Sequence, residues 1–121
     1  MSNERRLRKR VTLSVYLTAI DTQPNVPLGH IVEINAGGFL LLGEQVLRQS
    51  QQYSLNIQLP KTLQKPAMIN LIAKVVRTTP SAKAGFYESA FEISYASLET
   101  KRIIEQLQRD YHLNMPPKEP Q

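Results

Sequence analysis

Residues 11–20 read Val-Thr-Leu-Ser-Val-Tyr-Leu-Thr-Ala-Ile, and every odd position in this stretch is apolar. Side chains along a strand point alternately to the two faces of a sheet, so this alternation predicts a strand with one buried face. A turn is expected over 21–27, which contains Asp, Asn and two prolines. The opening of the chain therefore indicates β-structure.

The same alternation recurs along most of the chain. It predicts further strands at 28–35, 38–42, 53–59, 69–75 and 87–95, joined by short connections without helical segments. Asn35-Ala36-Gly37-Gly38 separates the second strand from the third, and its glycines permit the positive φ of a tight turn, so this pair is predicted to be a hairpin. We therefore expect a mostly β fold, a six-stranded antiparallel sheet closed into a barrel.

The pattern changes after the sixth strand. Ser97 is a suitable N-cap with Glu99 in the first turn, and we expect an α-helix from there to about residue 113. Ile104, Leu107 and Tyr111 form an apolar stripe at helical spacing, flanked by Leu98 and Ile103, which we expect to pack on the barrel. The predicted organisation is thus a basic N-terminal arm (1–10), a barrel with its C-terminal helix (11–113) and a flexible, proline-rich tail (114–121).

Length and composition set limits on the type of protein. The 121 residues fit one domain, and 41% apolar residues are typical of a globular chain. The absence of cysteine excludes disulfides and thiolate chemistry, and favours a reducing, cytoplasmic location. The longest apolar run, Phe39–Leu42, is far shorter than the ~18 to 20 residues of a membrane span, and no secretory signal is recognisable.

Positive charge is concentrated at the start of the chain. The basic arm, residues 1–10, holds five basic residues and one acidic residue, so it supplies +4 of the net charge of +5. The remaining residues are nearly neutral. A localised charge of this kind favours a discrete anion site over a nucleic-acid groove, which usually spreads its charge over a face.

Catalytic and metal-binding motifs are missing from the sequence. His30 and His112 are too far apart for a short ligand motif, and neither lies in a cluster of acidic residues. There is no nucleophile elbow, phosphate loop or dinucleotide-binding glycine motif. We therefore expect a non-enzymatic protein with no cofactor or metal.

Two features remain as candidates for a binding site. The first is the arginine-rich segment 5–10, and the second is Glu33-Ile34-Asn35-Ala36-Gly37-Gly38 at the hairpin. The planar guanidinium group binds a phosphate, or the O6/N7 edge of guanine, through two hydrogen bonds. Arg6 and Arg10 can point to one side of a folded arm, while the hairpin offers polar side chains and glycine backbone.

The order and spacing of these two segments resemble the PilZ domain family. That family has an Arg-x-x-x-Arg segment before its first strand and an Asp/Asn-x-Ser-x-x-Gly segment at the next hairpin. Arg6-Leu7-Arg8-Lys9-Arg10 matches the first segment in full. In the second, Gly38 matches, whereas Glu33 replaces Asp or Asn and Asn35 replaces Ser.

The resemblance implies a bacterial receptor for cyclic di-GMP that relays the second-messenger signal to an unidentified partner protein. Arg6 and Arg10 would then be the clamp on the ligand, with Arg5 as a helper. Glu33 and Asn35 would contact guanine or ribose edges. Gly37 and Gly38 would let the backbone approach the ligand closely.

Two other functions are kept as alternatives. Some members of the family have lost the ligand and act through protein contacts, for instance in pilus assembly. A small barrel that binds RNA or single-stranded DNA is disfavoured, because Tyr16, Phe39, Tyr53 and Tyr87 are scattered over different strands instead of forming one stacking surface.

Overall fold

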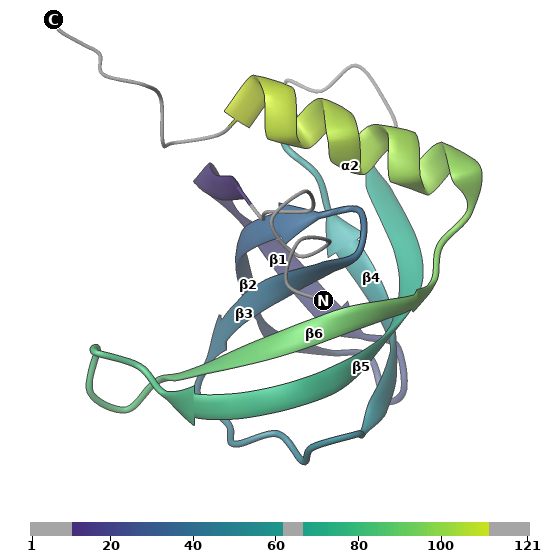
Figure 1. Ribbon diagram of the computed structural model, residues 1–121. Helices are drawn as coiled ribbons and strands as arrows, with labels where there is room; N and C mark the ends of the chain where they lie inside the picture. Colours follow the sequence, from purple (N-terminus) through teal and green to yellow (C-terminus); the bar gives the residue numbers. More distant parts are fainter. Residues whose placement is uncertain (1–10, 62–66, 112–121) are drawn as a thin grey trace, which may run out of the picture.

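The structure is a computed structural model that describes residues 11–61 and 67–111. These residues form six strands followed by one helix (Figure 1). The elements are β1 (Val11–Asp21), β2 (Val26–Asn35), β3 (Gly38–Gly43), β4 (Gln52–Gln58), β5 (Met68–Pro80), β6 (Tyr87–Tyr95) and α2 (Leu98–Tyr111). The mostly β fold with a C-terminal helix is confirmed, whereas the basic arm, residues 112–113 and the tail lie outside the described residues.

The strands close into a barrel in the order β1-β2-β3-β6-β5-β4, and all neighbours are antiparallel. Each strand is hydrogen-bonded on both sides, so the sheet has no free edge. The predicted hairpin is present, with Asn35 paired to Gly38 where β2 turns into β3. The predicted six-stranded antiparallel barrel is therefore confirmed.

Two element boundaries were predicted wrongly. β2 begins at Val26, because Val26 already pairs with Asp21 on β1, and the turn before it is shorter than the predicted 21–27. β5 continues beyond residue 75 to Pro80, since its second half pairs with β6 as far as Tyr87. Both extensions consist largely of exposed residues, so apolar alternation is too weak there to reveal the strand.

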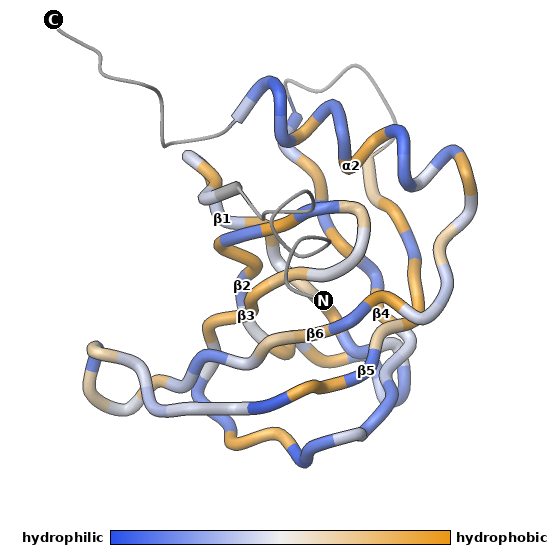
Figure 2. Tube along the Cα trace, viewed as in Figure 1, coloured by the Kyte–Doolittle hydropathy of each residue, from blue (hydrophilic) through white to orange (hydrophobic). Residues whose placement is uncertain are grey.

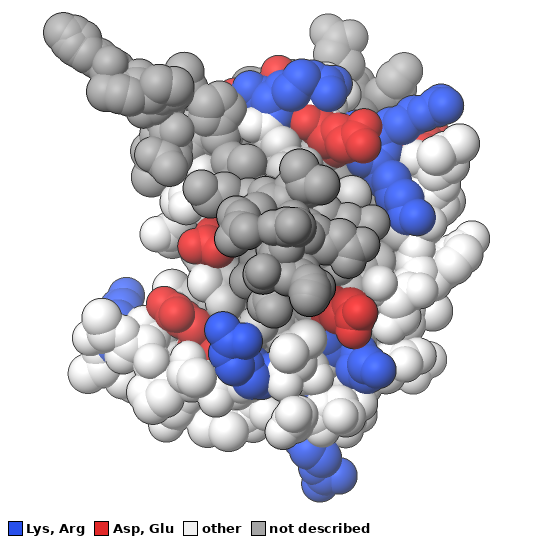
Figure 3. Space-filling model, in the orientation of Figure 1, with Lys and Arg blue, Asp and Glu red and all other residues white. Residues whose placement is uncertain are grey.

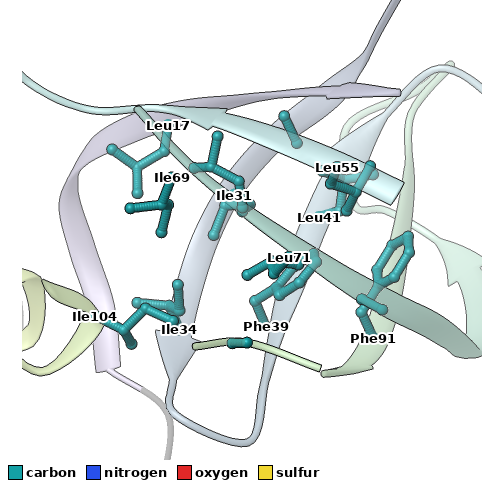
Figure 4. Packing of buried hydrophobic residues seen from close by; sticks show 14 of the residues in the cluster. Leu17, Ile31, Ile34, Phe39, Leu41, Leu55, Ile69, Leu71, Phe91 and Ile104 are labelled. Carbon is teal, nitrogen blue, oxygen red and sulfur yellow. The ribbon is translucent and has the colours of Figure 1, made fainter. Parts of the chain in front are cut away.

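The core fills the barrel and continues to the helix. Phe39 and Phe91 both lie in this core (Figure 4), where their rings stack with centroids 4.7 Å apart. The Tyr53 ring meets Phe91 edge-on, with the ring centroids 6.0 Å apart. Burial raises the pKa of the Tyr53 phenol, an effect that the Asp21 carboxylate increases and Arg48 opposes. Tyr53 is half-buried and packs against the core from its edge.

Helix α2 lies across one end of the barrel, with its hydrophobic side facing the strands (Figure 2). Ile104 and Leu107 are fully buried, so the predicted packing of this stripe is confirmed. Leu98, which we expected to flank the stripe, is exposed. Ser97 is the predicted N-cap, because its Oγ accepts a 3.0 Å hydrogen bond from the Thr100 amide. Within the described residues, no helix is long and apolar enough to cross a membrane.

Candidate functional site

The candidate site is the hairpin segment Glu33–Gly38, which we call the hairpin site. Asn35 Oδ1 accepts hydrogen bonds from the Gly37 amide at 2.6 Å and the Gly38 amide at 2.9 Å. This pattern is an Asx turn, in which a side-chain oxygen takes the place of a backbone acceptor. Asn35 is only 8% exposed. Its side-chain oxygen thus holds the turn in shape, a role that the sequence did not reveal.

The glycines of the hairpin site have a different purpose from the one expected. We predicted positive φ angles there, but among the described residues positive φ occurs at Asn25, Ser50, Gly29 and Gly85. Gly38 is instead needed for close packing, because a Cβ atom at this position would collide with the backbone carbonyl oxygen of Phe91 on β6. The prediction for the turn conformation was therefore wrong.

Strand β6 supports the hairpin site from one side. The Ile93 amide donates a 2.9 Å hydrogen bond to the Gly37 carbonyl oxygen, and Gly38 lies opposite Glu92 in the ladder. Glu92 is exposed beside the turn. The turn is consequently fixed both by Asn35 from within and by β6 from outside. Glu92 is a candidate site residue that sequence analysis missed, since only the β3–β6 pairing brings it here.

Strand β1 borders the hairpin site on the other side. Val11 pairs with Ile34, and Thr12 pairs with Glu33, which is half-buried. The chain therefore enters β1 next to the hairpin site, directly after Arg10. Arg5, Arg6 and Arg10 lie outside the described residues, so their contact with the ligand stays a prediction. Thr12 is a second neighbour that the sequence did not single out.

The ladder around Glu33 is irregular on both sides. The register shifts between Ile31 and Glu33 in the β2–β3 pairing, and between Thr12 and Leu17 in the β1–β2 pairing. Such β-bulges change the direction of neighbouring side chains and are frequent beside functional sites. Here they separate the regular part of β2 from the end that carries Glu33 and Asn35.

Charge on the described surface is mixed. Figure 3 shows basic and acidic side chains scattered over one face of the molecule, without a continuous basic surface among the described residues in that view. In the parts of the chain that the structure describes, no group of three or more His, Asp or Glu side chains is placed to hold a metal ion. Two acidic residues, Glu33 and Glu92, lie at or beside the turn, and Lys74 pairs with Glu92 across the β5–β6 ladder.

A shallow hollow lies at the far end of the β2–β3 hairpin. It measures about 230 Å³ and is bounded by Pro27–His30, Leu42–Gln45 and Phe86. Pockets for small organic ligands usually measure about 300 to 1,000 Å³. This hollow does not include the hairpin site.

The role of Asn35 in the turn gives a first prediction. Asn35→Ala is expected to lower the free energy of unfolding by about 1 to 2 kcal/mol, because two backbone amides lose their acceptor. Asn35→Asp is the control, since it retains an acceptor oxygen, and it should remain close to the parent protein at neutral pH. Urea unfolding measures both. An alanine variant as stable as the parent would show that the two hydrogen bonds contribute nothing.

The sequence matches no family model and no curated protein. Solved structures do resemble the barrel. Bacillus subtilis inhibitor of motility (MotI/DgrA) superposes with a TM-score of 0.69 over 84% of this chain at 18% identity. K. pneumonia MrkH superposes with a TM-score of 0.64 over 84% of this chain at 16% identity. The fold is shared. This chain covers 49% and 47% of those two chains respectively, so it spans about half of each.

Proposed function

We propose that this protein is a receptor that binds cyclic di-GMP between the arginine-rich segment 5–10 and the hairpin site, and relays the signal to a partner protein. One observation carries the proposal: Val11 pairs with Ile34, so the arginine-rich segment joins the barrel beside the hairpin site. This pairing supports the proposal, because the residue that follows the arginine-rich segment lies opposite the part of β2 that resembles the second PilZ segment. The barrel with its C-terminal helix is also the fold that this resemblance implies.

The chemistry of the two segments is complementary to the ligand. Cyclic di-GMP carries two phosphates, for which Arg6 and Arg10 supply planar donors that bind oxygens in pairs, with Arg5 beside them. Its guanine bases present N–H donors, for which the Glu33 carboxylate is an acceptor. The turn itself is held by Asn35 and β6, so it forms a fixed support for a flat base. Fixed partners reduce the entropy lost on binding.

The relay to a partner is proposed by analogy with one structural neighbour. The Bacillus subtilis chain is called an inhibitor of motility. We propose that this protein likewise acts on another protein and is a binding protein without catalytic activity or cofactor. We do not propose that the protein binds nucleic acid, because the positive charge of the chain is concentrated in the basic arm.

Calorimetric titration of the full chain with cyclic di-GMP tests the proposal. GTP and cyclic GMP are the controls, since they present guanine and phosphate without the cyclic dinucleotide geometry. Saturable binding of cyclic di-GMP alone is expected. Equal binding of all three nucleotides would mean that charge, and not the shape of the ligand, determines recognition.

A ligand-blind adaptor is the second candidate, and one observation favours it. The Asn35 oxygen is used inside the turn, at a position where the PilZ signature has Ser. A hairpin held in this way can act as a rigid surface for another protein. If cyclic di-GMP does not bind to the full chain in the titration, this candidate replaces the receptor.

Glu33 provides a test of the fit between the hairpin site and the ligand. Glu33→Asp restores the shorter carboxylate of the PilZ signature and is expected to tighten cyclic di-GMP binding about tenfold, or ~1.4 kcal/mol. Glu88→Asp is the matched control, because it makes the same change at another half-buried glutamate, which pairs with Leu42 near the far end of β3, and it should leave the affinity unchanged. Weaker binding by Glu33→Asp would show that the longer side chain already suits the ligand.

A further inference from the structure

The outer surface of β4 and β5 is uncharged over most of its length. Its outward-pointing side chains, which we call the amide face, are Ser54, Asn56, Gln58, Met68, Asn70 and Ile72. Lys74 follows at one end. In the closed strand order β4 lies opposite β3 and β5 lies opposite β2, although Lys74 at the end of the face pairs with Glu92 beside the hairpin site.

Hydrogen bonds link the side-chain amides of this face in a series, in which each donates to the next. Gln58 Nε2 donates to Asn56 Oδ1 at 2.6 Å, and Asn56 Nδ2 donates to Asn70 Oδ1 at 3.0 Å and also to Met68 Sδ. Within the described residues, Gln58 Oε1 and Asn70 Nδ2 make no hydrogen bond. One end of the series thus presents an acceptor, and the other end presents a donor.

Exposed apolar groups accompany the amides. Met68 is 44% exposed, and Tyr95, which pairs with Ile72 across the β5–β6 ladder, is 64% exposed. The centres of protein interfaces are depleted in charged residues and enriched in Tyr and Met. The amide face and Tyr95 therefore have the composition of an interface.

We propose that the amide face is a twofold interface with a second copy of this chain. In a twofold dimer, a contact between two different residues occurs twice. Asn70 Nδ2 of each copy can then donate to Gln58 Oε1 of the other, which satisfies both unpaired groups reciprocally. A charged face would meet its own copy across a twofold axis and bring like charges together, and a face with uncharged side chains avoids this repulsion.

Sedimentation velocity of the full chain without ligand tests this proposal. Across about 10 to 500 µM protein we expect a reversible monomer–dimer equilibrium, since an interface of one strand pair is small and should give a micromolar Kd. The equilibrium should persist at about 1 M NaCl, where contacts between charged surfaces are screened. A monomer at every concentration, or a dimer that dissociates in salt, would overturn the proposal.

Variants identify the surface. Asn70→Asp retains the size of the side chain, removes the donor and adds a negative charge, so it should raise the dimer Kd at least tenfold. Tyr95→Lys, on the neighbouring strand, should raise the dimer Kd in the same way. It replaces Asn70→Asp in the experiment if Asn70→Asp does not fold. The control is Val46→Asp, because Val46 is 67% exposed but lies between β3 and β4, outside the amide face. Equal weakening by Val46→Asp, or an unchanged dimer with folded Asn70→Asp, contradicts the assignment.

Discussion

Replacing Arg6 or Arg10 with alanine is expected to weaken cyclic di-GMP binding by about 1.5 to 3 kcal/mol, the usual range for a hydrogen bond to a charged group. Each variant removes a planar donor pair from a ligand phosphate or guanine. The melting temperature should change little, because both residues precede β1 and the core is formed by the strands and α2. Calorimetry at one salt concentration measures the affinity, and thermal unfolding checks the fold.

Arg8 and Lys9 supply matched controls within the same segment. Arg8→Ala and Lys9→Ala remove the same unit of charge but alter positions between the two arginines of the Arg-x-x-x-Arg pattern. If the clamp is specific, these variants should cost much less affinity than Arg6→Ala and Arg10→Ala. Four equal losses would mean that the basic arm attracts the ligand as diffuse charge, and the roles of Arg6 and Arg10 would then be wrong.

The barrel was predictable because apolar and polar residues alternate along large parts of its strands. In the first half of β5, for example, Ile69, Leu71, Ala73 and Val75 are all buried, as the alternation predicts. Alternation fails where a strand leaves the core. The second half of β5 is mostly exposed and is a strand only because β6 pairs with it, which is information from a distant part of the chain.

The location of the hairpin site was predictable from the sequence, but the structural roles of Asn35 and Gly38 within it were not. Its position between β2 and β3 follows from Asn35 and the two glycines that interrupt the alternation. The use of Asn35 Oδ1 by two turn amides is a local Asx turn, which the alternation of apolar residues does not reveal. Glycine is needed at position 38 because of the Phe91 carbonyl oxygen on β6, a strand that lies beside β3 only in the closed barrel. The amide face likewise needed the β4–β5 register to be recognised.

Gly38→Ala is expected to affect both the fold and the site. The new Cβ would collide with the Phe91 carbonyl oxygen, so β3 and β6 must move apart. Overpacking of this kind usually costs about 1 to 3 kcal/mol of stability. The movement would also disturb the Gly37–Ile93 hydrogen bond that fixes the turn, so we expect cyclic di-GMP affinity to fall at least tenfold.

Gly43 allows these two effects to be separated. It lies at the other end of β3, where a Cβ would come within 2.7 Å of the Leu28 carbonyl oxygen, so Gly43→Ala introduces a similar backbone collision away from the hairpin site. Both variants should lose stability in urea unfolding, but only Gly38→Ala should lose affinity when calorimetry is performed well below both melting temperatures. Equal loss of affinity in both variants would attribute the effect to general destabilisation. Unchanged affinity in a destabilised Gly38→Ala would place the ligand away from the hairpin site, because a ligand that contacts this turn must respond to its displacement.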